Sequence, residues 1–260
     1  MASKPTLIFV PGAWFPATAW TKLTTILATA GYKCVPVSLP SSTTGLPTAT
    51  FLDDVQAVAA AVRDETSAGA DVVVICHSYG GMPAQSILMD LDKPAVAAGG
   101  RVLGFAMIAS GFTMTGMSFL GGLGGVPPPS WRADMETGFA ELVADPMALF
   151  FHDLSEAEGA EWVGKLGKQS LRALSEGGEH AYAGWKDVPC WYLAATEDQA
   201  LPVEAQKFFV KMSRDAGGDI TLKEIKSGHS PMLSRPEETA EFVREAVDDF
   251  VKKGGMVKGE

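Results

Sequence analysis

The sequence contains few residues of the kinds that build disulfide frameworks, metal sites or nucleic-acid surfaces. It has four histidines and only three cysteines, Cys34, Cys76 and Cys190, which are far apart and odd in number. Each cysteine lies in or beside an apolar run, so we expect buried thiols rather than a disulfide framework or a metal site. The 21 Lys and Arg are outnumbered by 31 Asp and Glu, and the net charge of −10 disfavours nucleic acid, anionic membranes and polyanionic substrates as partners.

A long apolar run is also missing near the N-terminus. The stretch "MASKPTLIFVPG" has one Lys followed by only four apolar residues, which is too short for a secretion signal or a membrane span. We therefore expect a cytoplasmic protein. The 260 residues, 47% of them hydrophobic, suffice for one α/β domain with a large core and an insertion.

Apolar runs alternate with segments of helical spacing along most of the chain. Strand-like runs span residues 6–10, 32–39, 71–76, 101–109, 188–195 and 219–225. Helical spacing occurs over residues 16–30, 50–67, 79–91, 202–213 and 236–253. This alternation predicts an α/β fold, with a doubly wound, mostly parallel sheet of about six strands and right-handed crossovers.

Residues 113–186 break the alternation. They begin with the Gly/Pro-rich stretch "GMSFLGGLGGVPPPSW" and contain no convincing strand pattern. Helix-like patterns follow over residues 132–144, 146–151 and 155–175. We therefore expect a helical cap at 113–186, inserted over one end of the sheet, with a core domain formed by residues 1–112 and 187–260.

Three residue types that together form a catalytic triad follow three different strands. Ser78 follows the third strand, Glu197 and Asp198 follow the fifth, and His229 follows the sixth. Ligands of an open parallel sheet bind beyond the carboxyl ends of its strands, and His229 there would act as general base for Ser78. The residues alone do not separate Glu197 from Asp198, because an adjacent pair diverges in direction and only one should face His229.

The other three histidines are weaker candidates for the base. His77 is adjacent to Ser78 in the chain, so its side chain should point away from the turn and serve a structural role. His152 and His180 lie in the expected cap, where they would at most line a pocket.

The turn at Ser78 reads C-x-S-x-G, with Cys76 where a nucleophile elbow normally has its first Gly. At such an elbow the Ser adopts an unfavourable backbone conformation, and its neighbours must be small because strand and helix press together. Gly80 and Gly81 meet this requirement, and Cys76 demands only slight extra space. Cys76 is itself a poor nucleophile, because an apolar strand interior keeps its thiol protonated.

An oxyanion hole needs two backbone N–H donors that are already aligned. We expect one from Tyr79, which follows the Ser at a helix N-terminus, where the helix dipole adds to the effect. The other should come from the turn "VPGAW" after the first strand, in which Gly12 lets the chain bend towards the site. In that turn Ala13 is the first candidate and Trp14 the second.

Large apolar residues of the cap, together with Trp14, are candidates for the substrate pocket. They are Phe112, Met114, Trp131, Phe150, Phe151, Trp162 and Tyr182, with Gln169, Ser170, Tyr182 and Trp185 as sources of polar contacts. At helical spacing, such residues more often form the core of a cap than ligand contacts.

Taken together, these stretches resemble the α/β-hydrolase superfamily over nearly the whole chain. More narrowly, the chain resembles the branch of plant methyl esterases and hydroxynitrile lyases, with its uncharacterised fungal and bacterial relatives. The resemblance rests on "LIFVPGAWFPATAW", "VVVICHSYGG", "WYLAATEDQALP" and "SGHSPMLSRPEE". It implies an α/β-hydrolase fold, a triad in which Asp198 is the acid, and no metal or organic cofactor.

Two positions distinguish the activities of that branch. Its lyases carry a Thr in the first turn and a Lys directly after the catalytic His, where this sequence has Gly12 and Ser230. Without a cation beside His229 a cyanide leaving group lacks its stabiliser, so we expect ester hydrolysis. A third difference, Pro11 where a His usually precedes the Gly, concerns a structural position.

The expected protein is therefore a carboxylesterase, monomeric or homodimeric. It would cleave a small or medium ester, such as a methyl ester or lactone of a secondary metabolite, through an acyl-enzyme. A lyase that uses the same triad and a hydrolase-like small-molecule receptor are the alternatives.

Overall fold

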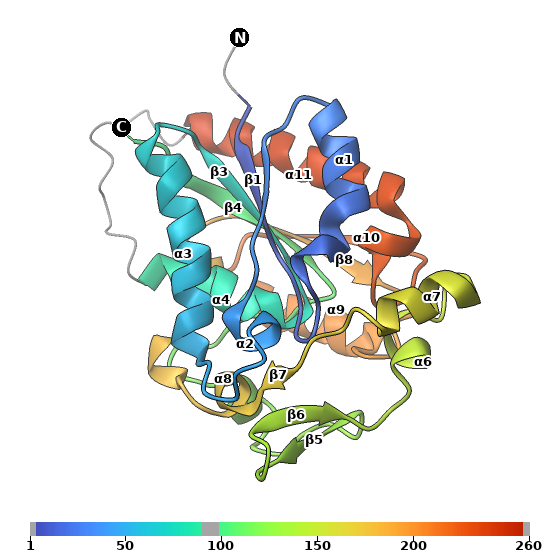
Figure 1. Ribbon diagram of the computed structural model, residues 1–260. Helices are drawn as coiled ribbons and strands as arrows, with labels where there is room; N and C mark the ends of the chain where they lie inside the picture. Colours follow the sequence, from blue (N-terminus) through green and yellow to red (C-terminus); the bar gives the residue numbers. More distant parts are fainter. Residues whose placement is uncertain (1–3, 90–98, 257–260) are drawn as a thin grey trace.

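The computed structural model describes residues 4–89 and 99–256 (Figure 1). Its centre is a six-stranded parallel sheet with the strand order β2-β1-β3-β4-β8-β9. The strands are β1 (Thr6–Val10), β2 (Cys34–Pro36), β3 (Val72–His77), β4 (Val102–Ile108), β8 (Cys190–Ala195) and β9 (Ile220–Ile225). Each begins within two residues of its predicted start, so the predicted doubly wound sheet is confirmed.

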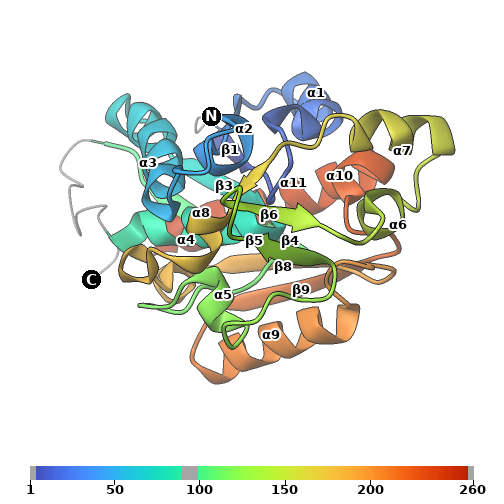
Figure 2. The ribbon, with the colours of Figure 1, turned by 60° about the horizontal axis from the view of Figure 1, so that its bottom comes forward.

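Helices cover both faces of the sheet (Figures 1 and 2). Helix α1 (Thr21–Thr29) packs with α11 (Pro236–Met256), and α3 (Phe51–Ser67) packs with α4 (Gly81–Ser86), while α9 (Val203–Asp215) packs on β8 and β9. The predicted helix over 79–91 is described only to residue 89, and its last two positions lie outside the described residues. Shorter helices are η1 (Ala17–Trp20), α2 (Pro40–Thr43), η2 (Ser78–Gly80), η3 (Ile87–Met89) and α10 (Pro231–Ser234).

Helix α3 shows how the sequence specifies such an element. A capping box starts it, because the Thr50 side chain accepts from the Asp53 N–H while the Asp53 carboxylate accepts from the Thr50 N–H. Apolar residues at helical spacing then face the sheet. The same buried face also carries two acids, Asp54 and Glu65.

Residues 113–186 lie over the carboxyl ends of the strands (Figure 1), and part of this segment is a small sheet. Strands β5 (Trp131–Asp134), β6 (Phe139–Leu142) and β7 (Gln169–Ser170) pair antiparallel. The expected helix over 132–144 and the expected absence of strands were therefore wrong. The physical reason is a tight turn, in which Gly138 has a φ of 76° and donates its N–H to the Asp134 carbonyl at 2.9 Å.

The rest of this segment is helical but broken into short pieces. They are α5 (Phe119–Gly122), α6 (Pro146–Phe150), α7 (Glu156–Val163), α8 (Leu171–Ser175), η4 (Gly178–His180) and η5 (Gly184–Lys186). The predicted helix over 155–175 is interrupted after Val163, close to two glycines at 164 and 167. The boundaries of the cap at residues 113 and 186 stay a prediction.

The three cysteines are free, and two of them are buried as expected. Cys34 is only half-buried, because β2 is an edge strand with a neighbour on one side. Over residues 4–89 and 99–256, no helix combines the length and the apolar composition that crossing a bilayer requires.

Candidate active site

Three residues with a strained backbone lie at the carboxyl ends of three neighbouring strands. Among the described residues, three that are not glycine have a left-handed backbone: Trp14 (φ 65°), Ser78 (φ 51°) and Ala109 (φ 44°). They lie just after β1, β3 and β4, which are adjacent in the sheet. A residue with a Cβ in this conformation costs about 1–2 kcal/mol, and such strain clusters at functional sites.

Ser78 occupies the turn between β3 and the helical segment that begins with η2. The space around it is tight, because a Cβ at Gly80 would collide with the carbonyl oxygens of Pro11 and Val10, and one at Gly81 would collide with the Ser110 hydroxyl. Ser110 Oγ donates to the Ser78 carbonyl at 2.6 Å. Small residues are thus required on the helix side of the turn, as the sequence indicates.

Cys76 lies two residues before Ser78, inside the sheet. It is fully buried on β3, paired with Val10 on one side and Met107 on the other. Burial raises the pKa of its thiol far above the ordinary value, so the thiol stays protonated and unreactive.

Asp198 and His229 form a buried pair. The His229 Nδ1–H donates to Asp198 Oδ2 at 2.8 Å, and both side chains are almost fully buried. Because a carboxylate only accepts, this bond leaves Nε2 as the unprotonated nitrogen of a neutral ring. The loop after β8 holds the acid in place, since Asp198 Oδ1 accepts the N–H groups of Ala200 and Leu201, both at 2.8 Å.

The structure separates the two acids that the sequence left open. Glu197 points outward, with its side chain 43% exposed and 3.7 Å from Lys226 Nζ. Asp198, by contrast, points inward, and its Oδ2 accepts a hydrogen bond from Gln206 on α9 at 3.1 Å. Asp198 is therefore the acid that faces His229.

The other histidines do not reach the cavity described below. His77 is fully buried, its ring centroid lies 4.6 Å from that of His229, and its Nε2–H donates to the His229 carbonyl at 2.9 Å. Burial holds the pKa of His77 well below its usual range, so it supports the loop as a neutral ring. His152 is exposed, and His180 lies 3.6 Å from Glu179.

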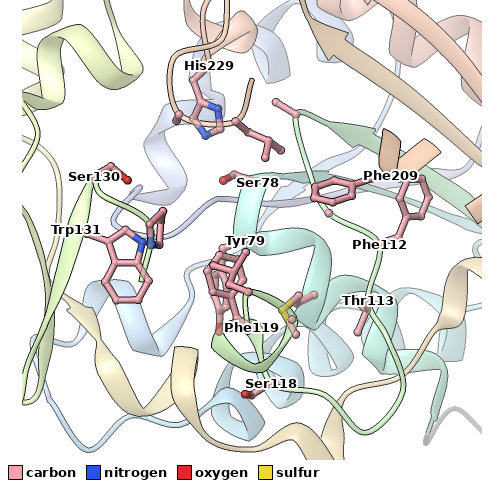
Figure 3. Close-up of a pocket in the computed structure, with 18 of the residues that line it drawn as sticks. Ser78, Tyr79, Phe112, Thr113, Ser118, Phe119, Ser130, Trp131, Phe209 and His229 are labelled. Carbon is pink, nitrogen blue, oxygen red and sulfur yellow. The ribbon is translucent and has the colours of Figure 1, made fainter. Parts of the chain in front are cut away.

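A cavity of about 420 Å³ lies beside Ser78 and His229. Figure 3 shows these two residues at one end, with Trp131 on one side and Phe112 on the other. Five of the expected pocket residues line it, namely Trp14, Phe112, Met114, Trp131 and Phe150. Its volume lies in the range typical of small-molecule sites.

Three expected pocket residues do not line this cavity, because they pack elsewhere in the molecule. Phe151 is fully buried against Phe15, with ring centroids 5.7 Å apart. Trp162 is buried on α7. Tyr182 lies between η4 and η5, and its backbone N–H donates to Ser86 Oγ at 3.1 Å.

The expected polar contacts also point away from the cavity. Trp185 Nε1 donates to the Thr113 carbonyl at 2.8 Å, and Ser170 Oγ donates to the Ala49 carbonyl at 2.7 Å. The Gln169 amide bonds to Ser41 and Ser42 behind the turn after β1.

Part of the cavity lining was not predicted from the sequence. Additional lining residues come from α4, from the loop around α5 and from α9: Met82, Met117, Phe119, Leu123, Phe208, Phe209 and Met212. Phe208 and Met212 are exposed large apolar residues four positions apart on α9. That i,i+4 apolar pair on an otherwise polar face was the available signal.

The turn after β1 approaches the Ser closely. A Cβ at Gly12 would lie 3.0 Å from the Ser78 Cβ and from His77 Nδ1, so only glycine fits without displacement. In the same turn, the Trp14 N–H already has an acceptor, because it donates to Gln169 Oε1 at 3.4 Å.

Comparison with known proteins agrees with this geometry. The model of the alpha/beta hydrolase family matches residues 7–242. The alpha/beta hydrolase nvfD of Aspergillus novofumigatus is 28% identical over 252 residues, covering 96% of this chain and 99% of that protein. Methylesterase 1 of Arabidopsis thaliana is 23% identical, covering 95% and 98%. The structure of polyneuridine aldehyde esterase has the same fold, with a TM-score of 0.73 at 21% identity over 94% of this chain and 100% of that one.

Proposed function

The chain belongs to the alpha/beta hydrolase family, and on that premise we propose that it is a serine hydrolase of neutral, largely apolar carboxylic esters. A methyl ester or lactone of a secondary metabolite is the substrate type we favour. One observation carries the proposal: the buried Asp198–His229 pair and the strained Ser78 meet at the same apolar cavity. The esterases named among its relatives and structural neighbours support it.

In the proposed mechanism, Ser78 Oγ attacks the ester carbonyl while His229 Nε2 takes its proton. Asp198 stabilises the imidazolium that forms, and His229 then protonates the leaving alcohol. Water then attacks the acyl-enzyme while His229 takes its proton. His229 returns that proton to Ser78 Oγ as the carboxylic acid product leaves.

The oxyanion would be bound by the backbone N–H groups of Tyr79 and Ala13. Tyr79 directly follows the Ser at the start of η2. The Trp14 N–H already donates to Gln169 Oε1, which favours Ala13 over Trp14 as the second donor.

The cavity wall indicates the class of ester. Of the described residues that line it, none is Lys, Arg, Asp or Glu, and most are aromatic or aliphatic. A charged group on the substrate would lose its hydration there without gaining a partner. Four methionines, at positions 82, 114, 117 and 212, line the cavity and can adapt to substrates of irregular shape.

The same wall argues against cyanohydrin cleavage. Ser230 follows His229 where lyase relatives have Lys, and it is fully buried. Within the described part of the chain, no Lys or Arg lines the cavity, so a leaving cyanide would find no cation.

The direct test combines a fluorophosphonate probe with short p-nitrophenyl esters. We expect the probe to label Ser78 and p-nitrophenyl butyrate to give an initial burst, with neither signal in Ser78→Ala. We expect kcat/KM for mono-p-nitrophenyl succinate, which has a similar length and a negative charge, to be at least tenfold lower. A folded protein that neither hydrolyses these esters nor reacts with the probe would contradict the proposal, and ligand binding without turnover would instead indicate a receptor.

A further inference from the structure

A buried polar cluster lies behind the Ser78 elbow. Its centre is Asp54 on α3, which is fully buried. The Tyr79 hydroxyl donates to Asp54 Oδ2 at 2.8 Å, and the Ser41 hydroxyl donates to the same oxygen at 2.5 Å. The Ser41 backbone N–H donates to Asp54 Oδ1 at 3.0 Å. The residue that follows the nucleophile is thus held through its side chain.

The cluster continues to the turn after β1 through one amide. Gln169 Nε2 donates to Ser41 Oγ at 3.0 Å, while Gln169 Oε1 accepts from Ser42 Oγ at 2.6 Å and from the Trp14 N–H at 3.4 Å. The donor and acceptor roles are consistent along the chain, because Ser41 gives its proton to Asp54 and accepts from Gln169. One chain of hydrogen bonds therefore joins Tyr79 to Trp14.

The same part of the cap holds the strained backbone of Trp14. The Trp14 carbonyl accepts from the Gly167 N–H at 2.7 Å, and the Trp14 Nε1–H donates to the Ala140 carbonyl at 3.0 Å. Together with the bond to Gln169, three contacts from the segment 140–169 hold a residue whose φ is 65°. These contacts fix the peptide group that joins Ala13 to Trp14, and with it the orientation of the turn in which the Ala13 N–H lies.

Asp54 is a charged residue at a fully buried position, where packing alone would favour an apolar side chain. No described Lys or Arg forms an ion pair with it; the nearby charge is another acid, Asp53, and the groups that face Asp54 are Ser41 and Tyr79. Burial raises the pKa of Asp54 to about 6, against the lowering effect of the Ser41 and Tyr79 hydrogen bonds. A buried carboxylate that has hydrogen bonds but no cationic partner still loses part of its hydration energy, so we infer a role for it beyond packing.

We propose that Asp54 and Gln169 are positioning residues that hold the Tyr79 and Ala13 N–H donors in one fixed relation across the oxyanion site. The inference rests on the proposed serine-hydrolase function. The carboxylate orients the Tyr79 side chain, and the amide orients the turn that contains Ala13. The shared link through Ser41 makes the two sides of the oxyanion site depend on each other.

The first test compares Asp54→Asn with Glu65→Gln. Glu65 is a matched control, because it is a buried acid on the same face of α3 that also accepts from a hydroxyl, that of Thr6 at 2.9 Å. For p-nitrophenyl butyrate we expect Asp54→Asn to lower kcat about 10- to 100-fold, a fraction of the effect of deleting an oxyanion donor, with KM within about threefold. We expect Glu65→Gln to keep kcat and KM near their wild-type values.

A pair of ketone inhibitors separates positioning from general damage. A trifluoromethyl ketone forms an oxyanion with the nucleophile, whereas a plain methyl ketone of the same shape binds as a ground-state analogue. We expect Asp54→Asn to weaken the first by about the same factor as kcat and to leave the second unchanged. Equal weakening of both would overturn the proposal.

A double-mutant cycle tests the coupling and does not depend on the Asp54 variant folding. Tyr79→Phe and Gln169→Met alter the two ends of the network, which share no hydrogen bond with each other in the structure. We expect the double variant to lose less activity than the product of the two single losses. Losses that simply multiply would overturn the proposal.

The two hypotheses fail in distinguishable ways. If the wild-type protein neither hydrolyses esters nor reacts with the fluorophosphonate, the proposed function fails. If the wild type is active and Asp54→Asn is as fast as Glu65→Gln, only the positioning role fails.

Discussion

The two ends of the central sheet are stabilised in opposite ways. At the carboxyl end, three left-handed residues surround an apolar cavity, and a buried carboxylate has no cationic partner. At the amino end, Glu65 accepts from Thr6 Oγ1 at 2.9 Å and from Lys33 Nζ at 2.5 Å, so the acid is paired. The amino end is built for stability, whereas the carboxyl end accepts strain and desolvation where the chemistry is proposed.

Helix α3 spans both ends and carries this contrast on one face. Asp54 and Glu65 are eleven residues, about three turns, apart. Burial raises the pKa of Asp54 to about 6, whereas the hydrogen bond from Lys33 lowers the pKa of Glu65 below its usual range. The pKa values of two acids on the same helix are therefore shifted in opposite directions, according to the end of the sheet that each acid faces.

The largest effect should come from removing the nucleophile at the carboxyl end. We expect Ser78→Ala to lower kcat for p-nitrophenyl butyrate by about 10⁶-fold, measured with equal amounts of folded protein. Cys76→Gly, two residues deeper in the sheet, should keep most of kcat and lose stability, because it removes a buried side chain from β3. The reverse pattern would assign the chemistry to the thiol.

The next largest effect should distinguish the two adjacent acids. We expect Asp198→Asn to lower kcat about 10⁴-fold, because the amide no longer favours the Nδ1–H tautomer of His229. Glu197→Gln should stay within about twofold, since it changes only an exposed pair with Lys226. Steady-state kinetics at neutral pH measure both, and equal losses would mean that the acid is misassigned.

The two acids of α3 should give opposite pH dependences of stability. The pKa of Asp54 is raised from 3.8 to about 6, so its contribution to folding is complete below about pH 3.8 and is lost as the pH rises through 6. From pH 4 to 7, the free energy of unfolding of Asp54→Asn should therefore improve relative to wild type by about 2 kcal/mol, somewhat less than the full shift at 1.36 kcal/mol per pKa unit, because part of the effect is already lost at pH 4.

Glu65→Gln should behave in the opposite way. The lowered pKa of Glu65 means that the wild-type acid stabilises the fold above its ordinary value of 4.5, and that this is lost as the pH falls through the lowered pKa. Urea unfolding of both variants from pH 3 to 8 measures the difference, since the Glu65 effect falls below pH 4.5 and the Asp54 effect between about pH 4 and 6. If the free energies of unfolding of the two variants changed with pH in the same way, the two ends of the sheet would not differ in this respect.

The smallest effect concerns strain at the end of β4. Ala109→Gly should leave the free energy of unfolding within about 0.5 kcal/mol of wild type, because relief of the left-handed backbone offsets the entropy that glycine loses and the buried methyl group that is removed. Ala106→Gly, on the same strand and fully buried, should instead destabilise by about 1 kcal/mol or more. Urea unfolding measures both changes, and similar destabilisation in both variants would mean that strain is not concentrated at the carboxyl end.

The sequence by itself determined the sheet and its helices, and it placed Ser78, Asp198 and His229 at the ends of their strands. Apolar periodicity is local, and a buried strand or an amphipathic helix shows it in consecutive residues. The hairpin over residues 131–142 was missed, because its few apolar positions fit helical spacing as well and the turn depends on Gly138.

Only the tertiary structure decided which side chains meet. Glu197 and Asp198 are equivalent in the sequence, and the N–H groups of Ala200 and Leu201 select one of them. Phe150 and Phe151 both pack on Phe15, but only Phe150 also lines the cavity. The first choice is made within the loop after β8 and the second by the packing of residues 113–186 against the sheet, and neither leaves a periodic signal in the sequence.

The network behind the elbow is the clearest example of such a long-range decision. It joins Trp14, Ser41, Asp54, Tyr79 and Gln169, which come from five separate segments of the chain. Local propensity and spacing do not specify such a set. The free energy that selects it comes from satisfying buried polar groups, which become neighbours only when these five segments pack together in the fold.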